Sequence, residues 1–254
     1  MPDHYSPGRR TGTEGVGMTT FVLVHGAWHG AWCWDRLVPE LEQRGHSAVT
    51  LDLPSHGSDT APAEGVTLTD YVDRVSEVLE MQTEPVVLVG HSMGGMVITG
   101  AAERVPERIR ALVYLTAFLP GDGDSLLALE EGNPNSAVPP ALLRAEDGRT
   151  ATIDPSRIRE LFFHDCSDAD AAAAVAQLTA QALAPLAEPL QLTEERFGSI
   201  PRVYVECTDD RAICIEMQRQ MITARGCDQI VSMDTSHSPF LSAPAELADH
   251  LSAV

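Results

Sequence analysis

The sequence predicts an α/β fold in which a mostly parallel six-stranded sheet is flanked by helices. Apolar segments typical of strands alternate with segments typical of helices, and this order indicates a parallel sheet with right-handed crossovers. The strand segments are short and continuously apolar, as expected for strands that are covered on both faces. With 254 residues, the chain is long enough for one α/β domain that carries an insertion.

Six segments are expected to form the strands of this sheet: Thr19–Val24, Ser47–Leu51, Pro85–Val89, Arg110–Leu115, Pro201–Cys207 and Asp228–Met233. Five further segments are expected to be helical: Trp32–Arg44, Leu68–Glu80, Met93–Glu103, Ile213–Arg225 and Ala245–Ser252. Residues 1–17 are polar and rich in glycine, so we expect a disordered tail there. No apolar stretch follows Arg9 and Arg10, which argues against a signal peptide.

Residues 118–198 interrupt the alternation of strands and helices. This segment is rich in proline and contains an alanine-rich stretch, Asp168–Ala184, that is expected to be a helix. It follows the fourth predicted core strand and ends before the fifth. We therefore expect a core formed by residues 18–117 and 199–254. A helical cap of residues 118–198 would lie over the active site and build the substrate pocket.

A Gly-x-Ser-x-Gly motif, Gly90–Gly94, lies between the predicted strand Pro85–Val89 and a predicted helix. A nucleophilic serine needs such a strained strand-to-helix turn, with glycines that let neighbouring backbones approach closely. Its hydroxyl projects at the start of a helix, where the dipole favours developing negative charge. We interpret Ser92 as a catalytic nucleophile. The weaker alternative is a glycine-rich turn with an incidental serine.

Candidates for the acid and the base of a catalytic triad follow Ser92 along the chain. His237 lies in a loop directly after the last predicted strand, from which it could reach the serine of a neighbouring strand. Asp210, with Asp209 as a rival, lies in the loop after Pro201–Cys207, at the edge where open α/β sheets place their sites. Either aspartate could orient the imidazole while the other caps the following helix.

Backbone amides in two loops are expected to stabilise an oxyanion. One is the N–H of Met93, the residue after the nucleophile, and the other is the N–H of Ala27, in the loop after the first strand. Removing one such donor typically costs about 3 kcal/mol of transition-state stabilisation. The residues expected to line the substrate pocket lie next to these groups in the sequence: Gly26, Trp28, His29, Phe118 and Ser238.

The composition of the chain excludes several classes of binding partner and cofactor. The formal net charge of −20 argues against nucleic acids and anionic membrane surfaces, and no apolar stretch of about 18 residues could span a membrane. The five cysteines are irregularly spaced, and neither Cys-x-x-Cys nor His-Glu-x-x-His occurs. We expect reduced thiols in a cytoplasmic protein, no metal, no cofactor and a small-molecule ester as substrate. The oligomeric state stays open, with a homodimer among the alternatives.

From Thr19 onward the chain resembles the α/β-hydrolase superfamily and, within it, the plant methylesterase and hydroxynitrile lyase-like family, as a bacterial-type esterase member. The matching segments are Phe21–Trp34, Leu51–Gly57, Val89–Gly95, Glu195–Ile213 and the His237 loop. The resemblance implies the α/β-hydrolase fold and a Ser-His-Asp triad. The family's acid is the second carboxylate of a Thr-x-Asp pattern, which favours Asp210 over Asp209. Its oxyanion donors correspond to the amides of Ala27 and Met93.

Two positions differ from the lyases that resemble this family. Those lyases carry a threonine after the first-strand histidine and a lysine after the catalytic histidine, whereas this chain has Gly26 and Ser238. Without the lysine, a departing cyanide would lack a stabilising charge, so the sequence favours a carboxylesterase-like serine hydrolase that works through an acyl-enzyme. Alternatives are a hydroxynitrile lyase or other C–C bond-cleaving enzyme, a lactonase or thioesterase, and a non-catalytic small-molecule receptor.

Overall fold

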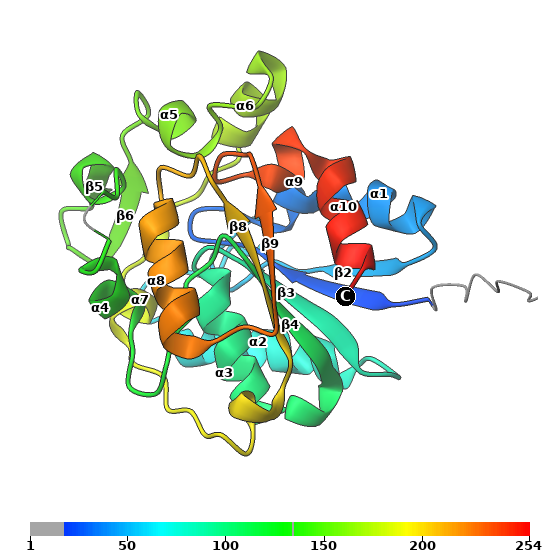
Figure 1. Cartoon of the computed structure of the whole chain (residues 1–254). Helices are drawn as coiled ribbons and strands as arrows, with labels where there is room; N and C mark the ends of the chain where they lie inside the picture. The colour runs from blue at the N-terminus through cyan, green and yellow to red at the C-terminus, as the bar shows by residue number, and fades with distance from the viewer. Residues whose placement is uncertain (1–17, 134) are drawn as a thin grey trace, which may run out of the picture.

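The computed structural model describes residues 18–133 and 135–254 (Figure 1). The predicted disordered tail, residues 1–17, lies outside the described residues. Six strands form one sheet in the order β2-β1-β3-β4-β8-β9, and every neighbouring pair is parallel. The strands are β1 (Thr20–Val24), β2 (Ser47–Thr50), β3 (Val86–His91), β4 (Ile109–Leu115), β8 (Arg202–Cys207) and β9 (Gln229–Met233). The predicted parallel six-stranded sheet is confirmed.

Helices pack against both faces of this sheet, and the two faces bury separate apolar cores. One core includes residues of α2 (Leu68–Glu80), α3 (Gly94–Arg104) and α8 (Ile215–Arg225). The other includes residues of α1 (Leu37–Gln43) and α10 (Pro244–Ser252). Residues of β3 alternate between the cores, since Val86 and Leu88 join the first and Val87 and Val89 the second. This two-sided burial explains why the strand is continuously apolar.

The helix expected over Trp32–Arg44 is two separate elements, the 3-10 helix η1 (Ala31–Trp34) and α1. Pro39 lies in the first turn of α1, where a proline is tolerated. A single helix through both segments would place Pro39 in its interior. There the missing N–H and the ring would disrupt the bond to the carbonyl four residues earlier. By contrast, α2 has the predicted bounds, and a capping box of Thr67 and Asp70 starts it.

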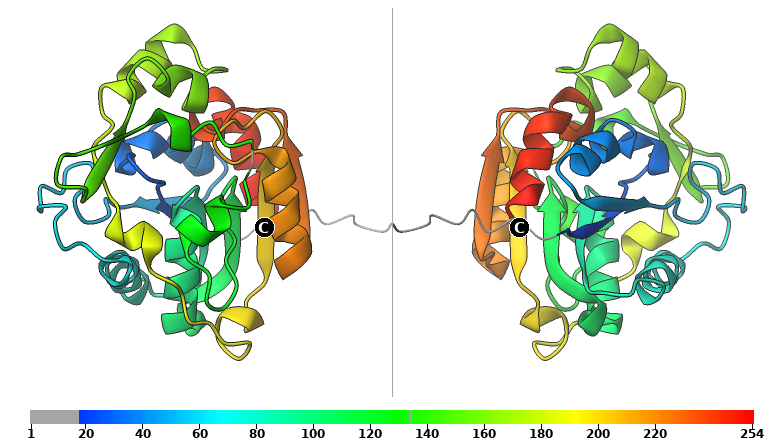
Figure 2. Two further views of the ribbon diagram at one scale, coloured as in Figure 1. Left: turned by 90° about the vertical axis from the view of Figure 1, so that its left-hand side faces the viewer. Right: turned by 90° about the vertical axis from the view of Figure 1, so that its right-hand side faces the viewer.

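Short elements make up the inserted segment, residues 118–198, and they are not all helical. The helices are α4 (Leu126–Glu130), η3 (Pro139–Ala141), α5 (Ile158–Phe162), α6 (Asp168–Val175) and α7 (Ala184–Ala187). The strands β5 (Leu142–Arg144), β6 (Thr150–Ile153) and β7 (Gln181–Ala182) form a separate antiparallel sheet. Helices α5 and α6 lie at the top of Figure 1 and of both views in Figure 2.

The expectation of one helix over Asp168–Ala184 was therefore wrong. Helix α6 ends at Val175, and Gln181 pairs with Ala151 of β6. The Gln181 side chain is fully buried and hydrogen-bonds His56 and Tyr71 of the core. These contacts outweigh the high helix propensity of alanine, which is only a weak determinant.

Within the described part of the chain, no helix is long and apolar enough to cross a membrane.

Candidate active site

Ser92 lies in the turn between β3 and α3, with a φ of 55°. This left-handed conformation is uncommon for a residue other than glycine and indicates local strain. Close packing explains the neighbouring glycines: a Cβ at Gly90 would lie 2.6 Å from the Gly94 carbonyl oxygen. The Ser92 carbonyl accepts hydrogen bonds from the amides of Gly95 (3.0 Å) and Phe118 (3.1 Å). The turn therefore has the geometry that the motif predicted for a nucleophile.

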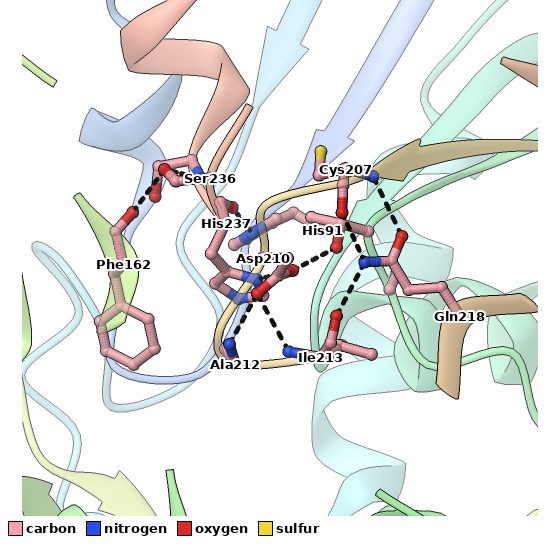
Figure 3. A network of polar contacts seen from close by, with 12 residues as sticks. His91, Phe162, Cys207, Asp210, Ala212, Ile213, Gln218, Ser236 and His237 are labelled. Atoms are coloured by element: carbon pink, nitrogen blue, oxygen red, sulfur yellow. Dashed lines mark hydrogen bonds and ion pairs between the residues drawn. The ribbon is translucent and has the colours of Figure 1, made fainter. Parts of the chain in front are cut away.

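Asp210 and His237 form a buried pair (Figure 3). Nδ1 of His237 lies 2.6 Å from Oδ2 of Asp210, and their side chains are 2% and 0% exposed. Oδ1 of Asp210 accepts the amides of Ala212 (2.6 Å) and Ile213 (3.0 Å), and the Thr116 hydroxyl donates to Oδ2. These donors orient the carboxylate to accept the Nδ1 proton of His237, which leaves Nε2 as the basic atom.

Asp209 does not contact this pair. Its carboxylate is 60% exposed and lies 2.9 Å from Nε2 of His164. The N-cap of α8 is Cys214, and no side chain caps this helix, so Asp209 does not cap it. Asp210 instead both holds His237 and accepts the amides that precede α8. The structure thus separates the two rival aspartates.

Ser92 and His237 line the same cavity, whose other lining side chains are apolar apart from Glu130. The loop after β1 supplies Ala27 and Trp28 to its wall. The inserted segment supplies most of the remainder, including Phe118, Leu126, Phe162 and Leu186. The indole N–H of Trp28 donates to the Ala151 carbonyl at 3.0 Å, so it offers the cavity no free polar group. The cavity suits an apolar group held beside Ser92.

Of the five residues predicted for the pocket, Trp28 and Phe118 line this cavity, whereas Gly26, His29 and Ser238 do not. A Cβ at Gly26 would lie 2.8 Å from the Ser92 Cβ, so Gly26 packs behind the serine. His29 is 1% exposed and contacts aromatic rings, and Ser238 is fully buried. They were expected in the pocket because they neighbour the site residues in the sequence and, for Gly26 and Ser238, because related lyases carry a threonine and a lysine there. Adjacent residues in a loop can point to opposite sides.

The amides of Ala27 and Met93 are available as hydrogen-bond donors. Both residues line the cavity, and neither N–H bonds another group among residues 18–133 and 135–254. Met93 directly precedes α3, so its amide belongs to the donors that a helix N-terminus leaves unsatisfied. The positive φ of Trp28 (64°) turns the chain sharply after Ala27. The geometry is compatible with the predicted oxyanion donors.

His25 holds the loop that carries Ala27, a role the sequence analysis did not assign. Its Nδ1 donates to the Gly26 carbonyl at 2.8 Å, and its Nε2 accepts the Leu53 amide at 3.1 Å. Complete burial, reinforced by His56, lowers the pKa of His25 to about 3. The imidazole is therefore neutral, and the proton on Nδ1 satisfies both bonds. Its position directly after a strand was the available sequence signal.

His91 and Gln218 hold the loops of the triad, and the sequence analysis assigned a role to neither (Figure 3). Nε2 of His91 donates to the His237 carbonyl at 2.8 Å, and burial holds the pKa of His91 well below its ordinary value. Gln218 of α8 accepts the Cys207 amide at 3.0 Å and donates to the Ile213 carbonyl at 2.7 Å. These bonds fix the backbone on either side of Asp210 and beneath His237.

Two consecutive residues of the inserted segment also contact the triad loops. Asp165 accepts the Ser236 amide at 2.8 Å and the Ser236 hydroxyl, next to His237. His164 bonds Asp209, next to Asp210. Neither residue was assigned a role from the sequence. A contact across 71 residues leaves no local signal in the sequence.

No group of three side chains suited to binding a metal ion occurs in the part of the chain that the structure describes.

Comparisons with known proteins agree with this fold and site. A model of the alpha/beta hydrolase family matches residues 21–250. The chain is 35% identical to salicylic acid-binding protein 2 of Nicotiana tabacum, over 91% of this chain and 95% of that protein. It is 34% identical to the pyrethroid hydrolase of Sphingobium wenxiniae, over 91% of this chain and 86% of that protein.

Among solved structures, polyneuridine aldehyde esterase matches with a TM-score of 0.84 and 29% identity, over 92% of this chain and 98% of that chain. The relatives thus include a named esterase and a named hydrolase with the same fold. They confirm the resemblance and the α/β-hydrolase fold expected from the sequence. The chain therefore belongs to the alpha/beta hydrolase family.

Proposed function

We propose that this protein is a carboxylesterase-like serine hydrolase that cleaves esters of small or aromatic molecules. The observation that carries the proposal is the buried Asp210–His237 pair, whose histidine lines the same apolar cavity as Ser92 on its strained turn. Family membership supports it, as do relatives named as an esterase and a hydrolase.

In the proposed reaction, Ser92 Oγ attacks the ester carbonyl while Nε2 of His237 takes the serine proton. Asp210 stabilises the imidazolium, and the amides of Ala27 and Met93 donate to the oxyanion. His237 then protonates the leaving alcohol as the carbon–oxygen bond breaks, which leaves an acyl group on Ser92. His237 next deprotonates a water that attacks this acyl-enzyme, so the products are a carboxylic acid and an alcohol.

We also propose that residues 118–198 act as a cap on a core of residues 18–117 and 199–254. Most of the cavity wall comes from this segment, including Leu126, Phe162 and Leu186. The segment would then select the substrate, while the loops of the core carry out the reaction. Exchanging residues 118–198 for the matching segment of a relative should transfer that relative's ester preference, which a panel of esters would show.

A cytoplasmic location remains part of the proposal. All five cysteines are free, and four of them are buried, as expected of a protein folded in a reducing compartment. The expected partner is a small-molecule ester, and the charge of −20 disfavours nucleic acids and anionic membranes. Fractionation of the source cells would test the location, and sedimentation would distinguish a monomer from a homodimer.

Ester hydrolysis is favoured over cyanohydrin cleavage by the absence of a cation beside His237. Ser238 takes the place of the lysine found in the related lyases, is fully buried and does not line the cavity. The chain contains no lysine at all, and among the described residues no arginine lines the cavity. A departing cyanide anion would therefore meet no lysine or arginine, and the protonated His237 would be its only charged donor among the described residues that line the cavity. Hydrolysis needs only the triad and two backbone amides.

The test uses p-nitrophenyl acetate, a fluorophosphonate probe and mandelonitrile. The wild type should cleave the ester and be labelled at Ser92, and Ser92→Ala should lose both properties while remaining folded. Ser55→Ala is the control, because Ser55 also has a positive φ but does not line the cavity. Near-normal turnover by Ser92→Ala would contradict the triad. Cyanide release that exceeds ester turnover and disappears in Ser92→Ala would assign a lyase instead.

A further inference from the structure

Glu130 is the one carboxylate that lines the cavity in the described part of the chain. It is the last residue of α4, where the helix dipole disfavours a negative charge. Burial also disfavours the charged form and raises the pKa of Glu130, against the opposing effect of the Asn133 and Ser136 side chains. Neither helix stability nor solvation therefore explains an acidic residue at this position.

The two carboxyl oxygens of Glu130 have different surroundings. Oε2 accepts the Asn133 side-chain amide at 3.1 Å. Oε1 is buried and accepts no hydrogen bond among residues 18–133 and 135–254, because the nearby Ser136 hydroxyl donates to the Ala212 carbonyl instead. A buried polar atom without a partner is uncommon and destabilising, and it calls for an explanation such as a ligand. One oxygen of a residue in the cavity wall thus has no partner in the described part of the chain.

A purely structural role for Glu130 would be to hold the loop after α4. That loop is already attached to the core without Glu130. The side-chain amide of Asn133 donates to the Ala212 carbonyl at 3.0 Å, and the Ser136 hydroxyl donates to the same carbonyl at 3.1 Å. Both bonds hold the loop against the segment that follows Asp210. The loop therefore does not require a carboxyl group at position 130.

We infer that Glu130 is a specificity-determining residue whose Oε1 binds a hydroxyl group on the part of an ester substrate that fills the cavity. The inference rests on the proposed ester hydrolysis. A hydroxyl both donates and accepts, so it pairs with a carboxylate and equally with a protonated carboxyl group. A carboxylate in the same place would be repelled by the ionised form of Glu130 and by Asp210. The substrate class is therefore an uncharged hydroxylated ester, and half-esters of dicarboxylic acids are excluded.

The experiment compares p-nitrophenyl 3-phenylpropanoates that carry a hydroxyl, a methyl or a carboxylate group at the ortho, meta or para position. In the wild type, at least one hydroxyl isomer should exceed its methyl counterpart about tenfold in kcat/KM, although the methyl group suits an apolar wall better. In Glu130→Leu, the ratio of kcat/KM for the hydroxyl ester to that for the methyl ester should fall to one or below. Glu130→Gln should keep most of the wild-type ratio and should accept the carboxylate esters better than the wild type does.

The matched control is Glu131→Leu, because Glu131 is the next residue and its side chain is exposed. This variant should keep the wild-type ratios. A merely structural role for Glu130 would lower all rates together and leave the ratio of hydroxyl to methyl esters unchanged. If Glu130→Leu fails to fold, the kcat/KM of Glu130→Gln for the carboxylate esters decides. Values no higher than those of the wild type overturn the inference.

The outcomes separate this inference from the proposed function. The role of Glu130 alone is overturned if the wild type cleaves p-nitrophenyl acetate but prefers no hydroxyl isomer. It is also overturned if the wild type cleaves p-nitrophenyl acetate but none of the phenylpropanoates. A wild type that cleaves neither class of ester and is not labelled at Ser92 overturns the proposed hydrolase function itself.

Discussion

The core and the inserted segment contribute different parts of the candidate active site. Ser92, Asp210 and His237 follow β3, β8 and β9, so they meet at the carboxyl edge of one parallel sheet. The inserted segment, residues 118–198, contributes most of the cavity wall, together with Glu130. The groups proposed to react thus belong to rigid strand ends, and the groups proposed to select the substrate belong to short elements around them.

The two regions also differ in packing. The central strand β3 of the core sheet is buried at every residue, whereas β6, the central strand of the small sheet, alternates between buried and more exposed residues. Polar bonds from His164 and Asp165 connect the segment to the loops of the triad. We therefore expect substitutions in the core to affect catalysis and stability strongly, and most substitutions in the segment to act more weakly.

The largest expected effect comes from the acid of the core. Asp210→Asn should lower kcat about 10⁴-fold, because an amide at this position favours the wrong tautomer of His237. Asp209→Asn should change kcat less than about threefold, since the Asp209 side chain is 60% exposed and bonds His164 rather than His237. Steady-state kinetics with p-nitrophenyl acetate measures both variants. The reverse pattern would show that the acid is misassigned by one residue.

The buried histidines of the core should make stability depend on pH. Burial lowers the pKa of both His25 and His29 to about 3, so the unfolded chain binds more protons than the native protein below pH 6.5. The contribution of these two neutral histidines to the free energy of unfolding is complete above pH 6.5 and declines as the pH falls toward 3. Between pH 7 and pH 5, the two together should lower the free energy of unfolding by about 4 kcal/mol.

Urea denaturation at the two pH values measures this loss. His29→Phe is the informative variant, because a phenyl ring fits the aromatic surroundings of His29 and cannot be protonated. It should remove about 2 kcal/mol of the loss in the free energy of unfolding between pH 7 and pH 5, which is the share of His29. Equal pH dependence in the wild type and His29→Phe would contradict the assignment of a buried neutral histidine.

A smaller effect is expected where the inserted segment meets the triad. Asp165→Asn should lower kcat about tenfold and leave KM nearly unchanged, because one amide and one hydroxyl of Ser236 lose a carboxylate acceptor beside His237. Kinetics with p-nitrophenyl acetate separates kcat from KM. An unchanged kcat would show that the position of His237 depends on the core alone.

The smallest effect is expected at the surface of the same segment. Arg159 and Asp168 form an ion pair with side chains that are 50% and 91% exposed. Arg159→Gln should change the free energy of unfolding by less than about 0.5 kcal/mol and leave kcat unchanged. Urea denaturation measures this change, and the variant is also the control for Asp165→Asn. A loss above 1 kcal/mol would show that the segment depends on its surface charges.

Local sequence patterns predicted most of the core. The apolar run before Gly90 marked β3, the segment Leu68–Glu80 was expected to be the helix that is α2, and the Gly-x-Ser-x-Gly motif marked the turn at Ser92. Each pattern depends on neighbours within a few residues, so a single sequence reveals it. In the inserted segment, propensity predicted one long helix where Gln181 pairs with β6 and bonds the core.

The sequence by itself determined the parallel sheet, the strained turn at Ser92 and the loop that carries His237, because burial periodicity and turn chemistry are local properties. The residues alone left Asp209 and Asp210 as rivals, and the family resemblance favoured Asp210. The tertiary structure places the Asp210 carboxylate against His237 and the Asp209 carboxylate at the surface. It alone also brought Glu130 into the cavity and Asp165 to the His237 loop. Such contacts join distant segments, and their energies depend on burial and direction, which no single stretch of sequence specifies.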